Sequence, residues 1–164
     1  MYGRIYIEEL IVENDINFDE SCYFDDVPWL PRILPLAQRV NCTSVRHLFY
    51  TQRGGSMVNT ANVNAVKRKV EGLLKVLELL LKHSAHKEVL DWYRRMYSHV
   101  VTSVLASVAT HLYDLRHDYV NRINQFNIYP LSKQKTSRKN IRKINLINFS
   151  PILFVWLVNK KNKK

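Results

Sequence analysis

The chain has 164 residues, and its hydrophobic fraction of 46% is enough for one modest domain with a core and too high for a protein that is disordered throughout. Its two cysteines, Cys22 and Cys42, are too few for a disulfide framework, and its first residues lack the cationic start and apolar run of a secretory signal peptide. These features favour an intracellular protein, cytoplasmic or nuclear.

The net charge of +11 is distributed unevenly. Residues 1–30 hold eight acidic residues against Arg4, a net −7, whereas residues 31–118 hold thirteen bases and six acids, a net +7. No Asp or Glu follows Asp118, and the last 46 residues carry eleven Lys and Arg. The excess charge therefore belongs to the C-terminal tail, and the opposite charges of the first two segments suggest that the acidic start shields basic side chains from a polyanion.

The N-terminal segment, residues 1–34, is acidic and contains prolines. Its Ile-rich stretch 4–12 suits either a short strand or a helical turn, and the pattern does not decide between them. Pro28 and Pro31 disfavour a helix, whereas Pro35 suits the first turn of one.

Two helices are predicted next. The first covers residues 35–53 and stops at Gly54 and Gly55, since glycine readily adopts the left-handed conformation that ends a helix. The second is capped by Asn59 or Thr60 and ends near His83. Its apolar positions follow helical spacing: Val63, Val66, Val70, Leu73, Leu74, Leu77, Leu80 and Leu81.

The third predicted helix is the longest and covers residues 86–124. Its apolar residues come in adjacent pairs about every four positions, which makes a stripe wider than one neighbouring helix covers. At roughly 1.5 Å per residue it would span about 57 Å, against about 36 Å for the second helix and about 28 Å for the first. Either it breaks near residues 98–107, or an apolar strip stays open for a partner.

Residues 126–164 form a basic tail in which Lys, Asn and Ile fill 19 of 39 positions. One interpretation is a basic arm with an apolar plug, PILFVWLV, that binds RNA or an anionic membrane surface; the plug is too short to span a bilayer. The other is a segment read from A- and T-rich sequence beyond an exon boundary, which would make the body a truncated scaffold. Both interpretations predict an irregular, disordered tail.

Three residues of the long helix suit RNA chemistry. Arg94, Arg95 and His99 stand as R-x₄-H and R-x₃-H, where Arg can hold a phosphate and His can transfer a proton. This spacing resembles the short Arg/His pattern of HEPN-like helical ribonucleases, and the resemblance implies action on RNA phosphates. The structural alternative is a solvated basic turn beside a histidine at the edge of the core.

Other candidate sites are less specific. His83 and His86 with Glu88 nearby have metal-ligand spacing, but a zinc site needs three or four ligands, so neither a metal nor a cofactor is predicted. Trp29, Trp92 and the tyrosines near Arg94 could stack on bases. Such aromatic residues more often belong to a core or a protein interface.

The sequence thus predicts an all-α protein, a small bundle or helical-repeat fragment of about three helices, with a long third helix and an irregular basic tail. Its predicted parts are residues 1–34, a helical body at 35–125 and the tail at 126–164. The first functional prediction is a non-enzymatic protein-interaction module, a fragment of a larger helical scaffold. Its partner-binding residues would be Trp92, Tyr93, Met96, Tyr97, Val101, Val104 and Leu105. The alternative is an RNA-associated protein that uses Lys67, Arg68, Lys69, Arg94, Arg95 and the tail.

Overall fold

The computed structural model describes residues 8–18, 29, 32–39, 41, 62–82, 90–134 and 136–163. The part of the chain that it describes is helical and contains no strand, which confirms the all-α prediction. The elements in chain order are α1 (Glu8–Val12), η1 (Leu34–Leu36), α3 (Val63–Lys82), α4 (Leu90–His111), η4 (Tyr113–Leu115), α5 (Arg116–Asn124), α6 (Arg138–Phe149) and α7 (Pro151–Asn162). Residues 8–12 of the undecided N-terminal stretch are therefore helical. The helix predicted at 35–53 begins only as the 3₁₀ turn η1, and residues 37–39 and 41 are not helical, so its first part is wrong; most of the rest lies outside the described residues.

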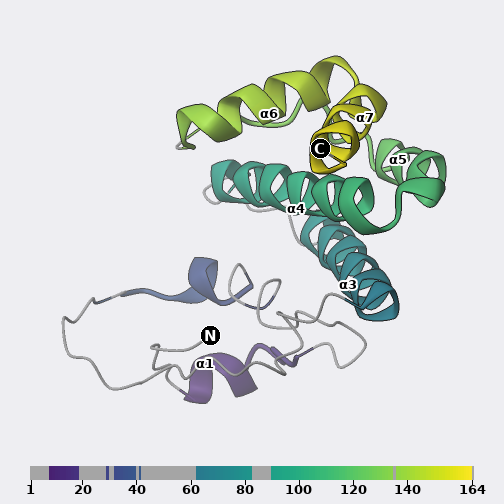
Figure 1. Ribbon diagram of the computed structural model, residues 1–164. Coiled ribbons are helices and arrows are strands. Elements are labelled where there is room, and N and C mark those ends of the chain that lie inside the picture. The colour runs from purple at the N-terminus through teal and green to yellow at the C-terminus, as the bar shows by residue number, and fades with distance from the viewer. Residues whose placement is uncertain are drawn as a thin grey trace.

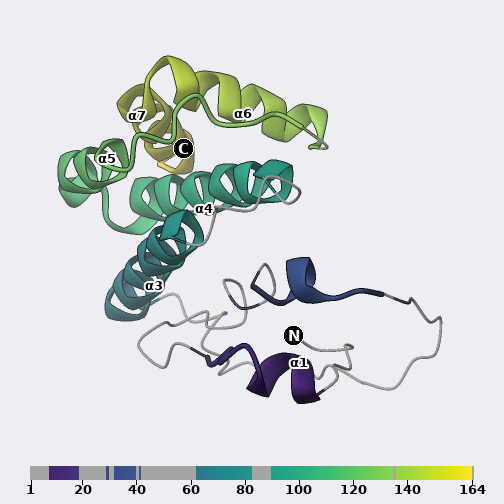
Figure 2. The same cartoon turned by 180° about the vertical axis from the view of Figure 1, so that it is seen from behind.

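Helix α4 is the centre of the main core. Helix α3 packs on one side of it, and α6 and α7 pack on the other (Figures 1 and 2). The α-helices α3, α4, α5, α6 and α7 each contribute buried apolar residues to this one core. A separate, smaller cluster joins Ile16, Trp29 and Ile33 near α1.

Helix α3 forms much as its periodicity predicts. Val66, Val70 and Leu74 are buried at helical spacing, and the stripe continues through the buried Leu77 and Leu80. The helix begins later than predicted: the Asn62 side-chain oxygen accepts a hydrogen bond from the backbone N–H of Asn64 at 2.8 Å. This bond satisfies one of the amides that a helix start leaves without a partner.

The prediction of one continuous helix over residues 86–124 is wrong. Helix α4 ends at His111, the chain turns through Leu112 and η4, and α5 then runs in a new direction (Figure 1). The break lies beyond residues 98–107, where the sequence suggested one. A straight helix would carry Tyr119, Val120 and Ile123 past the end of the core, whereas the turn buries all three.

The prediction of an irregular tail is wrong for residues 138–162. Ser137 and Ser150 cap α6 and α7 by accepting backbone N–H bonds, and Pro151 occupies the first position of α7, where its missing N–H costs nothing. Ile144, Ile147, Phe154 and Val155 are buried against the rest of the core. The division of the chain into acidic segment, body and tail stays a prediction.

Two asparagines of the tail also bond to α4. The Asn159 amide donates to the carbonyl of Ala109 at 2.8 Å, and the Asn162 amide donates to the Thr110 hydroxyl at 3.0 Å. Ala109 lies in the last turn of α4, where carbonyls have no partner inside the helix. Asparagines, one of the residue types that suggested an irregular tail, thus supply hydrogen bonds to the C-terminal end of α4.

Candidate functional site

A groove lies between α4, residues 132–134 and 136, and the first turns of α6, and it has a volume of about 380 Å³. Its lining residues on α4 are Arg95, Met96, Ser98, His99, Thr102, Ser103 and Ala106. The connecting segment and α6 add Ser132, Gln134, Thr136, Asn140, Lys143 and Ile144. We call this the α4–α6 groove.

Helical spacing brings the α4 residues of the groove together. Arg95, His99, Thr102 and Ala106 are four and three residues apart, so they form one stripe along α4. On α6, Asn140 and Lys143 are three apart and also share a face. The groove therefore exists only because α6 packs beside α4.

Asn148 holds the connecting segment against α6. Its side-chain oxygen accepts the backbone N–H of Leu131 at 2.7 Å, and its amide donates to the Leu131 carbonyl at 3.1 Å. Leu131 itself is buried in the main core. These contacts fix the start of the segment that carries Ser132, Gln134 and Thr136 into the groove wall.

The lining of the α4–α6 groove is cationic and rich in hydrogen-bond donors. Arg95 and Lys143 are half-buried, His99 is exposed, and none of the described residues that line the groove is Asp or Glu. The Ser98 and Thr102 hydroxyls donate along α4, to the carbonyls of Arg94 at 3.0 Å and Ser98 at 2.7 Å. The remaining hydroxyls and amides, together with the positive end of the α6 dipole, suit an anion with several oxygen acceptors.

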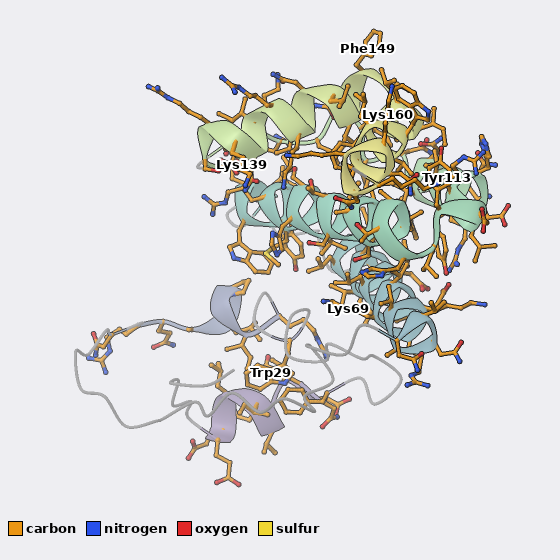
Figure 3. All side chains as sticks on the ribbon, viewed as in Figure 1. Trp29, Lys69, Tyr113, Lys139, Phe149 and Lys160 are labelled. Atoms are coloured by element: carbon orange, nitrogen blue, oxygen red, sulfur yellow. The ribbon has the colours of Figure 1, made fainter. Side chains whose placement is uncertain are left out.

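Only one of the five predicted nucleic-acid-binding residues lines the groove. Arg95 does so beside His99, the histidine of the Arg/His pattern, while Arg94 is exposed on α4 and is not part of the lining. Lys67 and Arg68 are exposed and Lys69 is half-buried on α3, which packs on the other side of α4 (Figures 1 and 3). The structure therefore does not bring the α3 bases and the α4 bases into one site.

The predicted partner-docking strip is largely the protein's own core. Tyr93, Tyr97, Val101, Val104 and Leu105 are buried by α3 and the C-terminal helices, and only Trp92 and Met96 stay partly exposed. The open strip was expected because the covering helices α6 and α7 were not predicted. Burial raises the pKa of Tyr93 to about 12, because its phenolate form would lose solvation by water.

The aromatic residues expected to stack on bases pack against other rings of the protein. Trp29 is buried in the N-terminal cluster, where Phe18 stacks on it with ring centroids 5.1 Å apart. The ring of Trp92 packs edge-on against the buried Tyr93, 5.5 Å away. A stacking platform beside Arg94 and Arg95 is therefore not formed by these rings.

The metal candidate cannot be placed, because His83, His86 and Glu88 lie outside the described residues. Within the described ranges no group of three His, Cys, Asp or Glu side chains could hold a metal ion.

Sequence reasoning missed the half of the groove that the tail contributes. Lys143 and Asn140 follow Ser137, a serine N-cap signal, and Ile141, Ile144 and Ile147 repeat every three residues, which is compatible with a helical face. These signals were present but were outweighed by composition. No protein-family model matches the chain, and no curated protein or solved structure is significantly similar to it.

Proposed function

We propose that this protein binds RNA without cleaving it, by holding backbone phosphates in the α4–α6 groove. The observation that carries the proposal is that Arg95 and Lys143 both line the groove, with no acidic side chain among its described lining residues. Arg95 offers a planar fork of donors to phosphate oxygens, and Lys143 adds a second positive charge from the opposite wall. The surrounding hydroxyls and amides can complete the hydrogen bonds of a phosphate or a ribose.

The groove chemistry favours binding over catalysis. His99 is the one histidine among the described residues that line the groove, and none of them supplies a carboxylate or a second histidine as its acid–base partner. Labelled RNA should therefore remain intact in the presence of the protein. Cleavage that disappears in His99→Ala would instead establish a nuclease.

Docking of a protein partner on α4 is the weaker proposal. Five of its seven residues are buried by the chain itself, so a partner would have to displace α3 or the C-terminal helices. Trp92 and Met96 alone leave a small contact area. That the chain is part of a larger helical scaffold is a separate proposal, and the groove proposal does not depend on it.

The test measures affinity for a fluorescein-labelled oligouridylate by fluorescence anisotropy over a range of salt concentrations. The double variant Arg95→Gln, Lys143→Gln removes one Arg and one Lys from the groove. On single strands, each phosphate contact contributes about 0.7 to the slope of log K against log salt. If Arg95 and Lys143 each make one phosphate contact, the slope of the double variant should therefore be shallower by about 1.4.

The matched control is Arg68→Gln, Lys67→Gln. It removes the same two residue types from exposed positions on α3, so the net charge is identical. The control should keep nearly all of the affinity and slope. An equal loss in both double variants would show that RNA responds to total charge, and the groove proposal would then be abandoned.

A further inference from the structure

Three large apolar side chains are exposed close together in the chain, where α6 turns into α7. Phe149 is 81% exposed, Trp156 45% and Leu157 40%. Phe149 ends α6, and Figure 3 shows its ring pointing away from the rest of the molecule. We call these three residues, with Lys160 and Lys161, the α6–α7 tip.

The outer face of α7 is apolar where a water-exposed helix face is usually polar. Phe154 and Val155 point into the core, which leaves Leu153, Trp156, Leu157 and Lys160 on the opposite stripe at spacings of three, four and seven. Leu153 is half-buried, and the others are exposed. Ordinary surface helices place charged or polar residues at such positions.

Lysines lie directly beside this apolar surface. The Lys160 ammonium is 5.0 Å from the centre of the Trp156 ring, and Lys161 is exposed in the same last turn. From Tyr119 to the end, the chain contains no Asp or Glu. The apolar surface and the positive charge therefore lie together on α7.

We propose that the α6–α7 tip rests on an anionic lipid surface. Phe149, Trp156 and Leu157 would enter the head-group region, and Lys160 and Lys161 would contact the phosphates and carboxylates of anionic lipids. An aromatic ring with a lysine above it suits the boundary between hydrocarbon and water. The tip lies on the surface and does not cross it: the described part of the chain holds no helix that is long and apolar enough to span a bilayer.

Lipid fits the tip better than RNA or a second copy of the chain. Bases stack on aromatic rings, but Leu157 and Leu153 offer no flat face for stacking. The exposed lysines would lie against one another in a symmetric contact between two tips, where like charges repel. Anionic head groups complement those lysines, and acyl chains accept aromatic and aliphatic side chains alike.

The test is flotation of the full chain with vesicles of phosphatidylcholine alone and of phosphatidylcholine with phosphatidylserine. The protein should float only with the anionic vesicles, and Phe149→Ser should lower the partition constant about tenfold or more, because a phenyl ring no longer leaves water. Lys160→Gln and Lys161→Gln should each lower it by about fivefold, and more salt should shrink that difference.

The matched pair of variants is Leu157→Ser and Leu115→Ser. Both leucines are exposed to a similar extent, 40% and 37%, but Leu115 lies on η4 and outside the tip. Only Leu157→Ser should weaken flotation. Equal binding of both variants, or of Phe149→Ser and the unaltered protein, would overturn the proposal.

Two further measurements separate the tip from other partners and from the groove. Phe149→Ser should keep the RNA affinity of the unaltered protein; if it loses RNA affinity and keeps vesicle binding, the tip is a base-stacking surface. If no vesicle is bound and Phe149→Ser turns an oligomer into a monomer in sedimentation, a second copy covers the tip. Either result rejects lipid as the partner, whatever the outcome of the Arg95 and Lys143 test.

Discussion

At the scale of single residues, Glu71 joins helices that are distant in the sequence. Both oxygens of its carboxylate accept hydrogen bonds from the Arg122 guanidinium at 2.7 Å, and Oε1 also accepts the Tyr119 hydroxyl at 3.0 Å. The bond from Arg122 is the main reason why the Glu71 pKa lies below its usual value of 4.5. Burial, and then the bond to Glu71, raise the pKa of Tyr119 to about 12. This cluster ties α5 to α3.

Glu71→Gln should lower the free energy of unfolding at pH 7 by about 0.5 to 1 kcal/mol, since nearly half of each partner's side chain stays in solvent. The sign follows from linkage: the Glu71 pKa is lower in the folded state, so the ionised carboxylate contributes stability above its unfolded pKa of about 4.5. That contribution is lost as the pH falls through the folded-state pKa.

Urea denaturation at pH 7 and at pH 3 measures this effect. The gap between the unaltered protein and Glu71→Gln should narrow at the lower pH. Glu78→Gln is the control, because Glu78 meets Lys75 at only one contact of 3.4 Å on the exposed face of α3. A gap that does not change with pH would contradict the role of the carboxylate charge.

At the scale of elements, α7 is attached to α4 by apolar burial and by hydrogen bonds. Phe154 and Val155 are buried in the main core, and Asn159 and Asn162 bond to the end of α4. The opposite, outer face of α7 contributes little to this packing. The element thus has one face that stabilises the fold and one that is available to a partner.

Phe154→Ala should lower the free energy of unfolding by about 3 to 5 kcal/mol, because it removes a buried ring and leaves a cavity. Leu157→Ala on the same helix should change it by no more than about 0.5 kcal/mol, because its side chain is exposed. Guanidinium denaturation followed by circular dichroism measures both. Similar stability of the two variants would mean that the C-terminal helices are not part of the cooperative core.

At the scale of the whole molecule, charge is separated along the chain. The first 30 residues carry a net −7, and the last 46 carry +11 and no acid. Because the groove and the tip both take cationic side chains from the C-terminal helices, they belong to the most positive part of the chain. An acidic N-terminal segment can compete with a polyanion for such surfaces.

Deleting residues 1–30 takes away a net −7 and raises the net charge from +11 to +18. RNA affinity at low salt should therefore increase, and the increase should disappear as salt screens the charges. Anisotropy with the same oligouridylate measures it. Unchanged affinity at low salt would show that the acidic segment does not shield the basic surface.

Local patterns were sufficient for several features. The apolar period of residues 63–82 correctly predicted α3 and most of its buried face, because an amphipathic stripe of this length has few other ways to leave water. The helical spacing of apolar residues correctly predicted that the described part of the chain is all-α. Arg95 and His99, which the sequence singled out together, both line the α4–α6 groove, since four residues of helix bring their side chains to one face.

The tertiary structure alone decided which apolar faces are covered and where the long helical pattern breaks. Apolar residues keep helical spacing on both sides of Leu112, and the burial of Tyr119, Val120 and Ile123 favours a turn there. Burial of Phe154 and Ile147 likewise stabilises two helices in the Lys-, Asn- and Ile-rich segment. These helices cover the predicted docking strip, and α6 forms one wall of the groove. The sequence determined which apolar residues each helix has to bury, and long-range packing determined which other helix covers them, because burial depends on residues far away in the chain.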